Sequence, residues 1–277
     1  MIIVNDLHKK FLRNDKPGIK NLSDLARLIG LKKKTEQQIH AVNGVSFRAN
    51  NGAITGLLGA NGAGKTTTLR MVAALLQPDM GSVLVDGIEV RAGESSTQSQ
   101  MGVLSDARGL YPRLTARENI HYYGILHGLT PEKTSQRTEQ LAEWLDMWQL
   151  LDRRTDGFSQ GERMKTALAR ALVHDPKNII LDEPTNGLDV VATRALRDFL
   201  RWLRSQEGGE KCIIFSTHIM QEVERLCDDV VIVAQGRNVA RGSVEELMRQ
   251  ANETNFEDAF VSLAFLEKQN LSHGGRQ

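Results

Sequence analysis

The chain has 277 residues, 40% of them apolar and 25% charged, a composition typical of soluble globular proteins with a sizeable core. With 35 Lys and Arg against 34 Asp and Glu, the net charge of +1 excludes a strong overall attraction to nucleic acid or anionic lipid. Two cysteines, Cys212 and Cys227, are too few for a disulfide framework, so we expect a reducing cytosol rather than secretion.

The N-terminal residues 1–6 predict a β-strand. They lack the basic stretch and apolar core of a secretory signal, so we expect no such signal. No part of the sequence reaches the ~18 consecutive apolar residues that cross a bilayer. We therefore expect any membrane association to depend on another protein.

Residues 12–40 do not fit the strand and helix pattern of the rest and are interpreted as an insertion. Within it, Asn21 is a candidate cap for a short helix, and a lysine triplet follows that helix. Two interpretations stand: a solvated surface element, or a helix beside the membrane or a membrane subunit. The residues on its apolar face and in the triplet are Leu22, Leu25, Ala26, Ile29, Lys32, Lys33 and Lys34.

A phosphate-binding loop is predicted at residues 59–66, where GANGAGKT matches G-x-x-x-x-G-K-[ST]. An apolar run at 54–58 predicts a strand before it, and residues 67–76 predict a helix after it. The backbone N–H groups of such a loop bind phosphates. We expect Lys65 to neutralise the β- and γ-phosphates and the Thr66 hydroxyl to bind Mg²⁺.

Residues 100–173 predict a helical lobe inserted into the sheet domain. Thr130 and Pro131 mark the start of one of its helices. The residues predicted on the buried face of that helix are Leu141, Trp144, Leu145 and Trp148.

Ser159 and Glu162 begin another predicted helix of the lobe with the spacing of a capping box. A cap alone explains both residues. The competing interpretation is that the Ser159 hydroxyl, the Gly161 N–H and the helix N-terminus form a second phosphate clamp, presented to a partner molecule. The spacing does not choose between them.

Two carboxylates, Asp182 and Glu183, end an apolar run at residues 178–181 that predicts a buried strand. Ligand sites of open α/β sheets lie at this carboxyl edge. We expect Asp182 to hold Mg²⁺ through its water shell and Glu183 to orient and polarise the attacking water.

His218 follows a further apolar run at residues 211–215, at the same predicted edge. A lone histidine is usually structural, but on this edge it can bind the γ-phosphate and the attacking water. Residues 189–206 predict an intervening helix, and residues 230–233 another strand.

The alternation of strands and amphipathic helices predicts an α/β fold with a mostly parallel sheet. We expect a P-loop NTPase sheet core with an inserted helical lobe over residues 1–250, and a C-terminal tail at 251–277.

These motifs, in this order, resemble the nucleotide-binding subunits of ABC transporters over nearly the whole chain. The corresponding segments are Walker A at 59–66, the signature loop at 158–162, Walker B at 179–182 with Glu183, the D-loop at 186–189 and the switch histidine His218. The resemblance implies ATP and Mg²⁺ as ligands, with Glu183, His218 and Lys65 as catalytic residues. Residues 7–11 resemble the segment whose aromatic side chain stacks on adenine, which nominates Phe11. The nucleotide-binding residues implied are Phe11, Gly59, Ala60, Asn61, Gly62, Ala63, Gly64, Lys65, Thr66, Thr67, Ser159 and Gly161.

The chain departs from the family pattern in two places. The signature loop has Gln160 and Glu162 where L-S-G-G-Q is usual. The loop after Val103 and Leu104, which normally offers a glutamine to Mg²⁺ and the membrane partner, has Asp106 instead. We retain Asp106 with Thr66 and Asp182 as a candidate metal ligand.

The resemblance also implies a mechanism and partners. Two subunits face head to tail, ATP closes this homodimer, and hydrolysis reopens it. A separate integral membrane permease receives the motion, which places the chain on the cytoplasmic face of the cell membrane, with no nucleic acid expected as partner. The alternatives are a soluble ABC ATPase acting on nucleic acid or ribosomes and a monomeric P-loop kinase.

Three segments look most like the sodium-extruding Nat-type proteins of the ABC-2 exporter group: residues 109–115, 215–222 and 256–260. This narrower resemblance implies Na⁺ export. Drug, lipid or polysaccharide export remain alternatives for the cargo.

Overall fold

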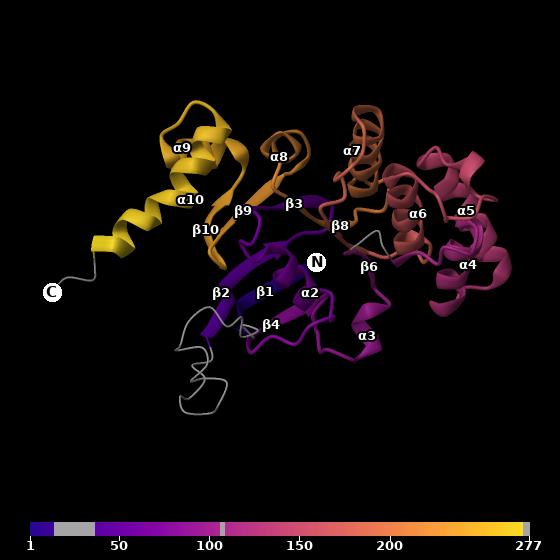
Figure 1. Ribbon diagram of the computed structural model, residues 1–277, viewed down its shortest axis with the longest axis horizontal. Helices are drawn as coiled ribbons and strands as arrows, with labels where there is room; N and C mark the ends of the chain where they lie inside the picture. Colours follow the sequence, from indigo (N-terminus) through magenta and orange to yellow (C-terminus); the bar gives the residue numbers. More distant parts are fainter. Residues whose placement is uncertain (14–36, 106–108, 274–277) are drawn as a thin grey trace, which may run out of the picture.

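The computed structural model describes residues 1–13, 37–105 and 109–273 (Figure 1). The predicted helix after Asn21, the lysine triplet and Asp106 lie outside the described residues. The described ends of the predicted insertion, residues 12–13 and 37–40, are strand residues: 12–13 pair with 37–38, and 39–40 pair with residues 10–11 of β1.

The described strands form two sheets. The first is antiparallel, in the order β2-β1-β4-β5. The second has the order β10-β9-β3-β8-β7-β6 and is parallel except for the pair β9 and β10. The strands of the first sheet are β1 (Ile2–Arg13), β2 (Gln37–Ala49), β4 (Met80–Val85) and β5 (Ile88–Glu89). Those of the second are β3 (Ala53–Leu58), β6 (Met101–Leu104), β7 (Asn178–Asp182), β8 (Cys212–Thr217), β9 (Asp229–Ala234) and β10 (Arg237–Gly242).

Figure 1 shows the helical lobe at one end of the molecule and the C-terminal helices at the other. The lobe contains α4 (Ala116–Leu126), α5 (Pro131–Trp144), η2 (Trp148–Leu150) and α6 (Gln160–Leu172). The other helices are α2 (Lys65–Val72), α3 (Ser95–Gln98), α7 (Val190–Arg204), α8 (Met220–Leu226), α9 (Val244–Ala251) and α10 (Phe256–His273). None of the helices within the described residues is long and apolar enough to span a membrane.

The central strands bury side chains on both faces, as expected for a parallel sheet. On β8, Ile214 packs in a core shared with β1, β4 and α2, whereas Ile213 and Phe215 pack toward the lobe and α7. These apolar runs explain why the strands at 54–58, 178–181, 211–215 and 230–233 could be predicted from the sequence alone.

The strand register aligns the carboxyl ends of the central strands. Leu58 of β3 lies opposite Thr217 of β8, and Asp182 of β7 lies opposite Ser216 of β8. The phosphate loop, the paired carboxylates and His218 therefore leave the sheet at one edge.

The lobe differs from the sequence prediction at two places. α5 ends at Trp144, because Asp146 takes a left-handed conformation with φ 47°. The turn buries Met147 and leaves Trp148 50% exposed, so the prediction that Trp148 shares the buried face of this helix was wrong. Leu141 and Leu145 are buried as predicted. Residues 101–104, at the start of the predicted lobe, form β6 of the parallel sheet.

The segment predicted as a C-terminal tail begins with an ordered helix. Phe256, Ala259 and Phe260 of α10 are buried in a core with β9, β10 and α9. The first half of α10, through Ala264, is thus packed onto the sheet domain.

Candidate nucleotide-binding site

The phosphate loop turns sharply between β3 and α2. Gly62 and Gly64 have φ angles of 81° and 107°, in the left-handed region that glycine adopts without steric cost. A Cβ at Gly64 would also collide with the carbonyl oxygen of Ala41 on β2. Glycine here therefore lets the loop approach β2 and still start α2.

Lys65 is buried and its ammonium group turns back over its own loop. Nζ donates a hydrogen bond of 2.7 Å to the Gly59 carbonyl and lies 3.4 Å from Oε1 of Glu183. This places the cation at the mouth of the loop, between the two motifs expected to handle phosphate.

Glu183 is held at the end of β7 by neighbouring β8. Its N–H donates to the backbone oxygen of Ser216 at 3.1 Å and to Ser216 Oγ at 3.2 Å, while its φ is 50°. Its carboxylate Oε2 lies 2.8 Å from Nδ1 of His218. Both carboxylate oxygens thus contact a residue predicted to be catalytic, His218 on one side and Lys65 on the other.

Ser216 is a site residue that the sequence reasoning missed. Its side chain is buried and its Oγ donates a hydrogen bond of 2.5 Å to Oδ1 of Asp182. Because Ser216 lies opposite Asp182 in the strand register, it orients that carboxylate directly. Ser216 lies in the FSTH stretch at residues 215–218, of which only His218 was interpreted as a site residue.

Replacing Ser216 with alanine is expected to leave Asp182 without this donor. A hydrogen bond to a charged group contributes about 1.5 to 3 kcal/mol, so we expect lower stability in urea unfolding. We also expect ATPase activity to need several-fold more Mg²⁺, because Asp182 is no longer oriented. Thr217→Val is the control, since the Thr217 hydroxyl is bonded to Ile219 N instead. An unchanged Mg²⁺ dependence in Ser216→Ala would contradict this role.

A cavity of about 420 Å³ opens beside the phosphate loop. It brings together Phe11, residues 61–67, Glu183 and His218, although these come from β1, the loop and two strand ends. Phe11 is 42% exposed, so its ring is available for stacking. Gly59 and Ala60 do not line this cavity, and their carbonyls face the Lys65 ammonium instead.

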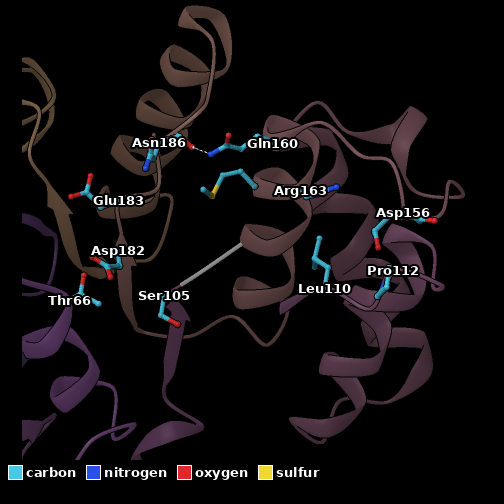
Figure 2. A pocket seen from close by; sticks show the side chains of 12 residues that line it. Thr66, Ser105, Leu110, Pro112, Asp156, Gln160, Arg163, Asp182, Glu183 and Asn186 are labelled. Carbon is cyan, nitrogen blue, oxygen red and sulfur yellow. Dashed lines mark hydrogen bonds between the residues drawn. The ribbon is translucent and has the colours of Figure 1, made fainter. Parts of the chain in front are cut away.

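A second cavity of about 770 Å³ separates the sheet edge from the lobe (Figure 2). Thr66, Ser105, Asp182 and Glu183 lie on the sheet side. Leu110, Pro112, Thr155, Asp156, Arg163 and Met164 line it from the lobe side.

The residues present fit a magnesium ion. The Thr66 hydroxyl and the Asp182 carboxylate line one cavity, and hard oxygen ligands are those that Mg²⁺ prefers. Within residues 1–13, 37–105 and 109–273, no group of three or more His, Cys, Asp or Glu side chains could hold a metal. Mg²⁺ usually takes one or two protein oxygens together with substrate phosphates, and Thr66 and Asp182 offer two such oxygens.

Ser159 caps α6 in a complete capping box. Its Oγ accepts from the Glu162 N–H at 3.2 Å, and Glu162 Oε2 accepts from the Ser159 N–H at 2.7 Å. A hydroxyl that accepts a hydrogen bond still has its own proton to donate. Ser159 therefore caps α6, and its hydroxyl proton is still able to bind a phosphate as a second role. Neither Ser159 nor Gly161 lines the cavity at the phosphate loop of its own chain.

Gln160 connects the lobe to the D-loop. Its Nε2 donates to the backbone oxygen of Asn186 at 3.0 Å, a contact drawn at the top of Figure 2. The amide also packs on Gly187, where any Cβ would collide with it. Asn186 itself lines both cavities, so this departure from the usual signature is accommodated by a specific contact.

A family model described as ABC transporter matches residues 42–186, more than half of the chain. The chain belongs to the ABC transporter family. It carries the ATP-binding domain of that family and is an ATPase.

Curated relatives of this ABC ATPase cover most of its length. It is 41% identical to the ABC transporter ATP-binding protein NatA of Bacillus subtilis, over 87% of this chain and 96% of that protein. It is 36% identical to the Nod factor export ATP-binding protein I of Ralstonia nicotianae, over 84% of this chain and 71% of that protein.

Solved structures share its fold. The ATP-binding subunit of an ABC transporter superposes with a TM-score of 0.77 and 26% identity, over 95% of this chain and 99% of that one. A dimeric ATP-binding cassette in a post-hydrolysis state, bound to ADP and phosphate, superposes with a TM-score of 0.74 and 20% identity, over 88% of this chain and 98% of that one. These matches confirm the predicted P-loop sheet core with its helical lobe.

Proposed function

We propose that this ABC ATPase is the motor subunit of an exporter and works as a homodimer on a separate integral membrane permease. The observation that carries the proposal is the Glu183 carboxylate, which contacts Lys65 and His218 at the cavity that the phosphate loop lines. This is the geometry needed to activate a water molecule next to a terminal phosphate.

Each residue has a distinct task in this proposal. Lys65 neutralises the β- and γ-phosphates, and Phe11 stacks on the adenine. Glu183 orients the attacking water and takes its proton, while His218 holds Glu183 in place and contacts the γ-phosphate. Mg²⁺, held by Thr66 and by Asp182 through water, would supply charge neutralisation of the phosphates.

The homodimer supplies the second half of each site. The Ser159 hydroxyl and the N-terminus of α6 would contact the ATP held by the partner, because neither Ser159 nor Gly161 lines the cavity at the phosphate loop of its own chain. The neighbouring cassette solved as a dimer supports this arrangement. Contacts that exist only with ATP bound favour the closed state, and their loss after hydrolysis reopens it.

The relatives support export as the function of the transporter. The resemblance of three segments to Nat-type proteins supports Na⁺ as its cargo. The Ralstonia relative is described as an export ATP-binding protein, and the NatA relative is the more similar of the two. Na⁺ is our proposed cargo, on the segments 109–115, 215–222 and 256–260. The permease would bind at the groove between sheet and lobe and hold the chain at the inner face of the membrane.

The test is Na⁺ transport by inverted membrane vesicles from cells that express this chain together with its permease. ATP is expected to drive ²²Na⁺ uptake, and vesicles carrying Glu183→Gln are expected to show none. Uptake of a drug or lipid without ²²Na⁺ would assign another cargo. Failure of the chain to purify with any membrane protein would contradict the motor role.

A further inference from the structure

Glu162 places a negative charge at the N-terminus of α6, beside Ser159. The hydrogen bond from the Ser159 backbone N–H, with a further bond from Arg153, holds the pKa of Glu162 below its usual value. The carboxylate is therefore ionised at neutral pH. If this helix end receives a phosphate of the partner's ATP, as our proposed function requires, two anions approach the same partial positive charge.

Arg153 forms an ion pair with the Glu162 carboxylate. Its Nη1 donates to Glu162 Oε1 at 2.8 Å, while Oε2 of the same carboxylate is bonded to Ser159 N. The guanidinium also lies over the ring of buried Phe158, 5.2 Å from its centroid. Both oxygens of Glu162 are thus occupied within the lobe.

The backbone around Arg153 fixes its position. The Arg153 carbonyl accepts from Ala116 N at the start of α4, and the Arg153 N–H donates to Leu150 O. The next residue, Arg154, forms a β-bridge with Thr115. The half-exposed Arg153 side chain therefore starts from a fixed backbone position when it contacts Glu162.

We propose that Arg153 is a positioning residue of the shared ATP site, which neutralises Glu162 and keeps the N-terminus of α6 attractive to the phosphate held by the partner subunit. The inference rests on the proposed homodimer. A cap without a phosphate would need no such neutralisation, because a carboxylate is itself favourable at a helix N-terminus. The neutralisation matters only when another anion arrives.

The test measures ATP-driven dimerisation by sedimentation, with the hydrolysis-deficient Glu183→Gln chain as parent. Arg153→Gln in that parent is expected to weaken the ATP-bound dimer by about tenfold, and more at low salt, because an unscreened like charge then faces the phosphate. Adding Glu162→Gln is expected to restore dimerisation, since glutamine keeps the capping box and removes the charge.

Arg154→Gln is the matched control, because it removes the same charge one residue away, where the charge acts on Glu118. Dimerisation of this control should equal that of the parent. Weakening by Arg153→Gln that Glu162→Gln does not restore would show a purely structural role and overturn the inference. Unchanged dimerisation of Arg153→Gln would overturn it as well. If the Glu183→Gln parent itself does not dimerise with ATP, the proposed homodimer is contradicted, and with it this inference.

Discussion

Glu183→Gln is expected to reduce ATP turnover by about 10² to 10⁴-fold while leaving ATP binding intact. Glutamine has the size of glutamate but cannot take the proton of the attacking water. The phosphate loop is undisturbed, because Lys65 keeps its bond to the Gly59 carbonyl. Turnover is measured as phosphate release, and binding by titration with a fluorescent ATP analogue.

The same variant is expected to accumulate as an ATP-bound dimer, since the step that reopens the dimer is blocked. Glu257→Gln makes the same chemical change on α10, away from the cavities, and should behave like the parent. Phosphate release by Glu183→Gln at near the parent rate would exclude Glu183 as the base.

Ser159→Asp is expected to abolish dimer closure and ATPase activity without loss of stability. Aspartate caps a helix as well as serine does, so α6 should form normally. Its carboxylate, however, would stand where the partner's γ-phosphate has to bind. Dimerisation is followed by sedimentation with ATP, and stability by thermal unfolding.

The chain contains a matched control for this experiment. Ser243 caps α9 with the same capping box, formed with Glu246, and has nearly the same backbone angles as Ser159. Ser243→Asp should therefore preserve stability, dimerisation and turnover. If Ser159→Asp also hydrolyses ATP like the parent, Ser159 is only a cap.

The parts of the site that could be predicted are those encoded within a short stretch of sequence. The phosphate loop needs glycines at fixed spacing, and Ser159 with Glu162 form the predicted capping box. The strand ends could be predicted because buried parallel strands are apolar along their whole length. That these ends meet at one edge follows from the parallel register.

The parts that could not be predicted depend on residues far apart in the sequence. Ser216 contacts Asp182 because two strands 34 positions apart align side by side. The exposure of Trp148 follows from a left-handed Asp146, which no periodicity reveals. The cross-contact from Gln160 to Asn186 requires the lobe to be placed against the sheet domain.

The left-handed backbone of Glu183 has a consequence for engineering of this ATPase. A non-glycine residue held at a φ of 50° costs about 1 to 3 kcal/mol, which glycine would not incur. Glycine at this position would relieve that cost and also remove the carboxylate that contacts Lys65 and His218. Selection for heat resistance alone is therefore expected to enrich inactive chains at position 183, and such a screen has to include ATP turnover from its first round.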